Sequence, residues 1–158
     1  MFHAKHCTQT GTWTAVRHAP KASRFYAIRA GDYNRCMYSA KLLDQFQNPR
    51  NTGEVEAPDS SARLENPACG DILELSLRLE KTTVDRARIA EIRFRAKGCV
   101  PTIACGSALT ELIQGKRVEE ARQLSREELV RKVGGLPPAS VHASHLAMDT
   151  LAALLRGL

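Results

Sequence analysis

Two stretches in the middle of the chain alternate between apolar and polar residues. In residues 73–80, four leucines alternate with polar side chains, and residues 92–97 alternate in the same way. A period of two predicts β-strands with one buried face. The link between them, about residues 81–88, is short enough for an antiparallel hairpin. A further short strand is expected at residues 62–65, within the polar loop of residues 50–68.

Helical spacing of apolar residues precedes and follows these strands. One helix is expected from Met37, and three more are expected after Cys99. Residues favoured at helix ends support this interpretation. They are Asn48-Pro49 after the first helix, Pro101 and Gly115 around the second, Ser125 and Glu128 at the third, and Ser140 before the last. The predicted order is a helix, a small antiparallel sheet, and then several helices.

The length of 158 residues favours one domain with a real core. No apolar run approaches the roughly 20 residues of a membrane span, and the N-terminus lacks the apolar stretch of a secretory signal. The chain has five cysteines, an odd number, and they lack the dense spacing of a disulfide scaffold. They indicate a reducing compartment with free or metal-bound thiols, so a cytoplasmic location is expected.

Charge divides the chain unevenly. Residues 1–36 hold six basic side chains and one acidic one, whereas the other 122 residues hold 17 basic and 16 acidic side chains. A nucleic-acid-binding protein would need a basic stripe on its folded elements, so this class is not expected. Because residues 1–36 lack a sustained apolar period, we expect them to be disordered and the domain to span residues 37–158. Residues 1–36 are interpreted as an upstream extension of the reading frame before Met37; a transit peptide is the alternative.

Residues that commonly bind metals lie at the ends of the predicted elements. Cys69 and Asp71 precede a strand, Cys99 follows one, and His142 opens the last helix. Side chains at such ends can converge on one point. Thiolate, carboxylate and imidazole together suit zinc or iron better than magnesium or calcium. The sequence therefore predicts a metal or iron–sulfur site.

Each of these residues also has a simpler interpretation. Cys69 could be a small buried hydrophobe, although its flanking Gly and Asp favour exposure. Asp71 could be a turn residue, and Cys99 could be a core thiol, although Gly98 before it would let the backbone approach a metal closely. His142 could be a surface histidine, although the positive end of a helix favours the neutral imidazole that binds metals.

Two further residues are possible auxiliaries to the site. His145 lies three positions after His142, hence on the same helix face, and could be a spare ligand or a neighbouring polar residue. Cys105 shares a helix face with Leu109 and Leu112, which is typical of packing. Its position in the first turns after Cys99 leaves a redox or sulfur-accepting role as the alternative.

Several separated motifs, in this order from Met37 to the C-terminus, resemble the iron–sulfur cluster scaffold family of IscU and the N-terminal domain of NifU. They are Met37-Tyr38-Ser39-Ala40-Lys41, Asn48-Pro49-Arg50-Asn51, Asn66-Pro67-Ala68-Cys69-Gly70-Asp71, Lys97-Gly98-Cys99, Leu112-Ile113-Gln114-Gly115-Lys116, and Leu136-Pro137-Pro138 with Val141-His142. The resemblance implies an α+β fold of the SufE/NifU kind, in which a small antiparallel β-sheet packs against several α-helices.

The resemblance also implies a site and partners. Cys69, Asp71, Cys99 and His142 fall where the family places site residues for iron or a [2Fe-2S] cluster. Sulfur would come from a cysteine desulfurase, and the cluster would pass to apo-protein acceptors. The third cysteine of the family, which is its usual persulfide acceptor, is replaced here by Ala143. The Leu-Pro-Pro chaperone motif also lacks its usual continuation, so a chaperone partner is left open, as is a homo-oligomer.

Three functions follow from these observations. The first is a cluster-assembly scaffold or cluster carrier, which is not an enzyme. The second is a zinc-stabilised interaction module of the same fold that has lost scaffold activity. The third is a thiol enzyme that uses Cys69 or Cys99 with His142, and it is the least favoured because no nucleophile motif surrounds these residues.

Overall fold

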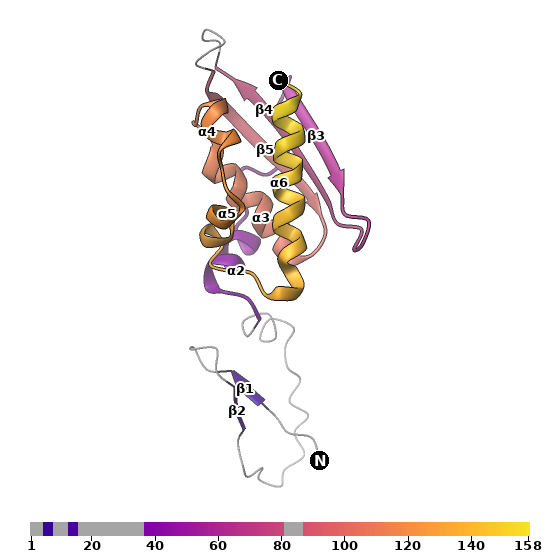
Figure 1. The fold of residues 1–158 in the computed structure, drawn as a ribbon, viewed down its shortest axis with the longest axis vertical. Coiled ribbons are helices and arrows are strands. Elements are labelled where there is room, and N and C mark those ends of the chain that lie inside the picture. Colours follow the sequence, from indigo (N-terminus) through magenta and orange to yellow (C-terminus); the bar gives the residue numbers. More distant parts are fainter. Residues whose placement is uncertain (1–4, 8–12, 16–36, 81–86) are drawn as a thin grey trace.

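The computed structural model describes residues 5–7, 13–15, 37–80 and 87–158. From residue 37 onward the chain runs from a short helix into a sheet and then into a series of helices, as the sequence predicts (Figure 1). The strands of the sheet are β3 (Ser60–Glu65), β4 (Ile72–Leu79) and β5 (Ile89–Lys97). The helices are α2 (Ala40–Gln47), α3 (Val100–Ile113), α4 (Val118–Arg122), α5 (Arg126–Lys132), the 3-10 turn η2 (Pro138–Ser140) and α6 (Val141–Arg156).

The sheet is antiparallel, with β4 between β3 and β5. Leu75 pairs with Phe94 across β4 and β5, and both side chains are buried, so the alternating pattern does mark one buried face. The predicted antiparallel pairing of these two strands is confirmed. The turn predicted between them falls mostly on residues 81–86, which lie outside the described residues.

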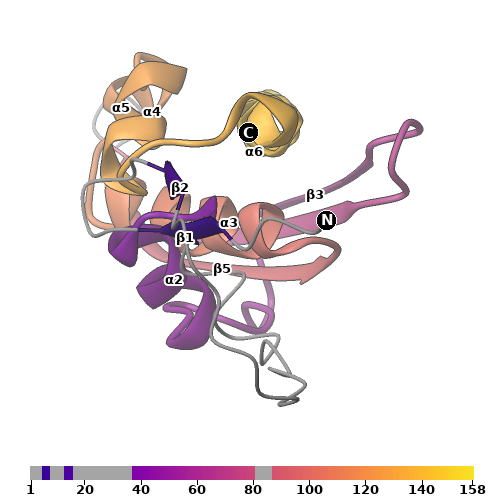
Figure 2. The same ribbon diagram turned by 90° about the horizontal axis from the view of Figure 1, so that it is seen from below.

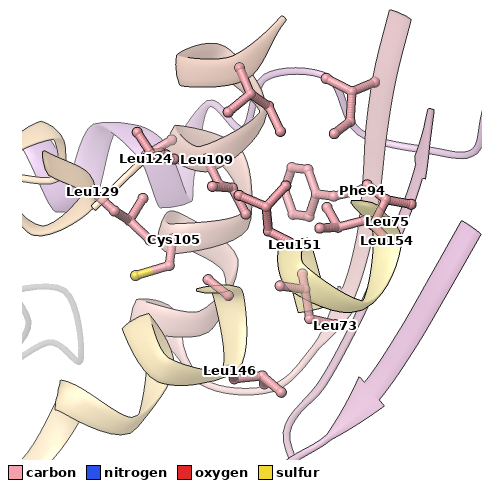
Figure 3. Close-up of a cluster of buried hydrophobic side chains, with 14 of the residues drawn as sticks. Leu73, Leu75, Phe94, Cys105, Leu109, Leu124, Leu129, Leu146, Leu151 and Leu154 are labelled. Carbon is pink, nitrogen blue, oxygen red and sulfur yellow. The ribbon is translucent and has the colours of Figure 1, made fainter. Parts of the chain in front are cut away.

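Helices α3 and α6 cover the buried face of the sheet. Helix α3 lies against β5, while α6 lies against β3 and β4 and also contacts α3 (Figures 1 and 2). The approach of α3 is close, since a Cβ atom on Gly106 would come within 2.7 Å of the Phe94 ring. Figure 3 shows the core that results, in which leucines of the strands meet apolar side chains of α3, α5 and α6.

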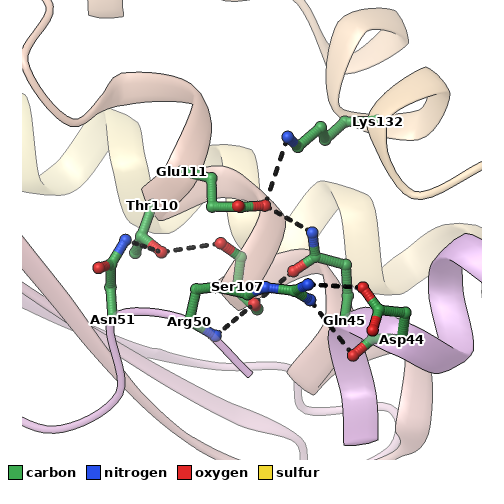
Figure 4. A network of polar contacts seen from close by, with 8 residues as sticks. All are labelled: Asp44, Gln45, Arg50, Asn51, Ser107, Thr110, Glu111 and Lys132. Atoms are coloured by element: carbon green, nitrogen blue, oxygen red, sulfur yellow. Dashed lines mark hydrogen bonds and ion pairs between the residues drawn. The ribbon is translucent and has the colours of Figure 1, made fainter. Parts of the chain in front are cut away.

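A polar network joins α2 to α3 and α5 on the other side of α3 (Figure 4). The buried Gln45 donates from Nε2 to Glu111 at 2.6 Å and accepts a hydrogen bond from Ser107. Lys132 lies 3.3 Å from the same Glu111 carboxylate. Because each of the three helices contributes a partner, this network fixes α2 against the two later helices.

The helix ends agree with the sequence in most places. Ser125 and Glu128 form the predicted capping box at the start of α5. Ser140 was expected to cap the last helix through its side chain, and this expectation is wrong. Ser140 ends the 3-10 turn η2 directly before α6, and its side chain makes no capping hydrogen bond. Helix α4 was not predicted, since five residues are too few to display an apolar period.

Two three-residue strands, β1 (Lys5–Cys7) and β2 (Trp13–Ala15), pair with each other in antiparallel fashion. The other residues before Met37 lie outside the described part of the chain, so the disorder expected for residues 1–36 stays a prediction. No helix among the described residues is long and apolar enough to cross a membrane.

Candidate metal centre

The turn between β3 and β4 presents Cys69 and Asp71. Asn66 organises this turn, because its side-chain oxygen accepts from the Ala68 amide at 3.0 Å and its carbonyl accepts from the Gly70 amide at 2.7 Å. Gly70 has a φ of +72°, a left-handed conformation that glycine adopts without a steric penalty. The turn leaves Cys69 exposed and directs Asp71 inward, where it is only 6% exposed.

His142 meets these two residues from the first turn of α6. One ligand atom from each of Cys69, Asp71 and His142 lies within 4.8 Å of the other two, which is the spacing of atoms that share a metal ion. The structure therefore brings together three of the four residues that the sequence singled out. The β3–β4 turn and the beginning of α6 both lie at the end of the sheet-and-helix domain that is away from the C-terminus (Figure 1).

Cys99, the fourth residue, lies beside this group. It occupies the N-cap position of α3, and its Sγ atom is 3.3 Å from the Thr102 hydroxyl oxygen. Burial raises the pKa of the Cys99 thiol; the hydrogen bond with Thr102 opposes this effect and the nearby Asp71 carboxylate adds to it. A metal that binds Cys99 must therefore displace its proton.

Asp71 is held by the residues that surround it. Its Oδ2 atom accepts a hydrogen bond from the Thr102 hydroxyl at 2.6 Å, and Thr102 is only 1% exposed. Burial by itself would raise the pKa of Asp71, but hydrogen bonds from Thr102, Cys99 and Cys69 outweigh it and lower the pKa below the ordinary value. The carboxylate is therefore charged at neutral pH, as a metal ligand must be.

Gly98 has a different role from the one expected. A Cβ atom at this position would lie 2.6 Å from Asp71 Cγ and 2.7 Å from Oδ1, so the missing side chain makes room for the carboxylate. The sequence interpretation assigned this space to an approaching metal. Here the Asp71 carboxylate occupies this space instead.

The two possible auxiliary residues lie apart from the three-residue group. Cys105 is fully buried in the core, and burial, with a smaller contribution from Cys99, raises the pKa of its thiol to about 12. This placement fits the packing interpretation and opposes a sulfur-accepting role. His145 is exposed, and its Nε2 atom lies 3.1 Å from the Arg126 guanidinium rather than beside Asp71.

Thr102 is a residue that sequence reasoning missed. It lies three positions after Cys99, so the helical period places its side chain near that of the N-cap residue. That spacing is a signal in the sequence, but a threonine at this position is also common in ordinary helices. Only the fold brings Asp71 to the same hydroxyl.

Comparisons with known proteins place this chain in one class, the domains described as NifU-like N-terminal domains. The model of that family matches residues 37–156. The chain belongs to this family, which confirms the resemblance and the expectation that the protein is not an enzyme.

The chain is similar in sequence to proteins named as iron–sulfur cluster assembly scaffold protein IscU. It is 40% identical to IscU 1 of Archaeoglobus fulgidus over 115 residues, which cover 73% of this chain and 72% of the relative. It is 37% identical to the Aquifex aeolicus protein over 72% of this chain and 71% of the relative. For the Escherichia coli protein the identity is 34%, over 75% of this chain and 91% of the relative.

Solved structures confirm the predicted α+β fold. A putative scaffold protein for the SUF system from Fervidobacterium islandicum superimposes with a TM-score of 0.60 at 20% identity, covering 75% of this chain and 96% of that one. The N-terminal part of a NifU-like protein from Brucella abortus gives a TM-score of 0.57 at 16% identity, covering 75% of this chain and 92% of that one.

Proposed function

We propose that this protein is an iron–sulfur cluster assembly scaffold or cluster carrier, which binds iron or a [2Fe-2S] cluster and passes it to acceptor proteins. The observation that carries this proposal is the convergence of Cys69, Asp71 and His142 within 4.8 Å, in a chain of the NifU-like N-terminal family. Thiolate and imidazole are donors that iron and zinc accept, and the carboxylate completes a mixed set.

The placement of the donors suits a cargo that is later released. Cys69 is exposed, so an acceptor could reach a metal bound there from solvent. Asp71 and Cys99 hold the inner side of the site, where Asp71 is buried and Cys99 is half-buried. In the proposed function Cys69, Asp71, Cys99 and His142 are the ligands, and Cys105 and His145 are not required.

Ala143 limits the proposed function. In the family resemblance a third cysteine directly follows the histidine, whereas Ala143 here has a methyl side chain that is 1% exposed. We therefore propose that, among the residues that the structure describes, Cys69 and Cys99 supply the thiolates to the cluster. Sulfur delivery from a cysteine desulfurase through a thiol at position 143 is then absent, and sulfide must reach the site by another route.

The proposed partners are a cysteine desulfurase and apo-protein acceptors. Membership of the family supports assembly partners in general. Leu136 and the two prolines after it lie between α5 and α6, so a chaperone that binds this connector would contact the chain close to the helix that carries His142.

The alternative is a zinc-stabilised interaction module. One observation favours it: the three donor atoms lie close enough together to share one ion, and a fourth donor, Cys99, is adjacent, which matches the four-coordinate sites of structural zinc. Zinc binding by itself is compatible with both functions. Retention of sulfide together with iron is compatible only with a cluster scaffold or carrier.

Anaerobic reconstitution separates the two functions. The protein is incubated with ferrous iron and sulfide, desalted, and analysed for iron, labile sulfide and visible absorbance. We expect iron and sulfide to be retained together by the unmodified protein and lost in Cys69→Ser, because the exposed thiolate is removed. Retention of zinc, without iron or sulfide, in the unmodified protein would favour the interaction module.

A further inference from the structure

The Thr102 hydroxyl contacts two of the proposed ligands at once. It donates to Asp71 Oδ2 at 2.6 Å and lies 3.3 Å from Cys99 Sγ. A hydroxyl carries a single proton, and here that proton is given to the carboxylate. The Cys99 Sγ atom lies within hydrogen-bonding distance of the same hydroxyl, so one side chain contacts both residues.

Thr102 is itself fixed in place. Its side chain is 1% exposed, and its backbone belongs to the first turn of α3, where the Thr102 amide donates to the Cys99 carbonyl at 3.1 Å. Water has little access to replace the hydroxyl if it is removed. The hydroxyl is therefore a rigid point from which the neighbouring carboxylate and thiol can be oriented.

We propose that Thr102 is a positioning residue of the metal centre, whose hydroxyl fixes the Asp71 carboxylate and holds the Cys99 thiol beside it. This proposal rests on the proposed function, in which those two residues are ligands. Partners that hydrogen-bond to a ligating carboxylate orient it and restrict its rotation, and their loss typically costs about 10- to 100-fold in metal affinity. Thr102 is not expected to bind the metal itself.

The geometry at the other carboxylate oxygen of Asp71 supports this role. The carboxylate lies directly against the backbone of Gly98, where a Cβ atom would be 2.7 Å from Oδ1. The carboxylate therefore has Gly98 close to Oδ1 and the Thr102 hydroxyl at Oδ2. Together with the hydrogen bonds that Cys99 and Cys69 make to the same carboxylate, the Thr102 hydrogen bond restrains how the carboxylate is turned.

The test compares side chains that differ mainly by this hydroxyl. Thr102→Val replaces the hydroxyl by a methyl group of similar size, and Thr102→Ser retains it. Thr102→Ala and Thr102→Ser form a second pair, which decides the question if the valine variant does not fold. Thr150→Val is the matched control, because Thr150 is also fully buried and its hydroxyl donates only to the Leu146 carbonyl within α6, at 2.6 Å.

Zinc affinity is measured by competition with a chelator, and cobalt spectra report the ligand geometry through their thiolate charge-transfer and d–d bands. We expect Thr102→Val and Thr102→Ala to bind zinc about 10-fold more weakly than the unmodified protein and to show altered cobalt bands. Thr102→Ser and Thr150→Val should resemble the unmodified protein in both measurements. A residue that only stabilises the fold would lower the melting temperature and leave the cobalt spectrum unchanged.

Two results would overturn the proposal while leaving the metal centre intact. One is an unmodified protein and a Thr102→Val variant with the same zinc affinity and the same cobalt spectrum. The other is an equal loss of affinity in Thr102→Val and Thr150→Val. If the unmodified protein binds neither zinc nor cobalt through thiolates, the metal centre of the proposed function is refuted, and the role of Thr102 is refuted with it.

Discussion

Replacement of Gly98 by alanine tests the geometry of the site without replacing any of the proposed ligand residues. The backbone of Gly98 is not left-handed, so alanine is acceptable there on conformational grounds. The new methyl group would lie 2.6 Å from Asp71 Cγ. That is about 1 Å closer than the roughly 3.5 Å at which two carbon atoms make good contact, so the carboxylate must move.

The cost of this substitution can be estimated from packing. Insertion of a methyl group into a close-packed place typically costs about 1–3 kcal/mol of unfolding free energy, and we expect Gly98→Ala to fall in this range. The displaced carboxylate would also lose its hydrogen bond to Thr102. We therefore expect weaker zinc binding as well as lower stability.

A double-mutant cycle in the metal-free protein isolates the clash. Urea unfolding is measured for the unmodified protein, Gly98→Ala, Asp71→Ala and the double variant. In the Asp71→Ala background the two nearest atoms, Cγ and Oδ1, are absent and the Cβ atom remains 3.0 Å away, so Gly98→Ala should cost clearly less than it does beside the aspartate. If the two costs agree within about 0.5 kcal/mol, the substitutions are additive and Gly98 does not make room for Asp71.

Three further expectations concern residues on and around the site. Cys105→Ala should retain bound metal and lower the free energy of unfolding in urea by about 1 kcal/mol, because it leaves a small cavity in the core. Cys69→Ser, in contrast, should lose the metal. Loss of metal in Cys105→Ala would contradict the packing role of Cys105. Burial would raise the pKa of Glu111, but its hydrogen bond from Gln45 and neighbouring cations lower it overall. This carboxylate therefore stabilises the fold above its unfolded-state pKa, and that contribution is lost as the pH falls through its lower folded-state pKa. Glu111→Gln should then reduce the loss of stability in acid, measured by urea unfolding between about pH 6 and pH 3, and an unchanged pH profile would refute the assignment. Ala143→Cys should increase desulfurase-dependent cluster formation, measured by absorbance; equal rates with and without this cysteine would show that Ala143 marks no loss of function.

The sequence predicted the elements wherever one residue pattern dominated. The alternation along β4 and β5 specified a sheet with one buried face, and the end signals located α3 and α5. Helix α4 was missed because five residues contain too little of a period to recognise. The role of Ser140 was misjudged because the 3-10 turn η2 precedes α6, so the usual capping geometry does not form.

The sequence allowed prediction only of those site residues whose side chains commonly bind metals. Cys69, Asp71 and His142 carry metal-binding chemistry and lie at element ends, so their approach could be expected from the sequence. Gly98 and Thr102 carry no such chemistry by themselves. Their roles depend on the turn before β4 lying against the beginning of α3, which is a tertiary contact that no local pattern in the sequence encodes.

Cluster transfer is the measurement that tests the central claim most directly. The reconstituted protein is mixed anaerobically with an apo-ferredoxin of the [2Fe-2S] type in the presence of an iron chelator, and the absorbance of the ferredoxin product is followed. A scaffold or carrier should deliver its cluster to the ferredoxin faster than free iron and sulfide assemble one, and little iron should reach the chelator. If the protein keeps its metal, or if the chelator captures the iron and the ferredoxin remains empty, the proposed function is contradicted.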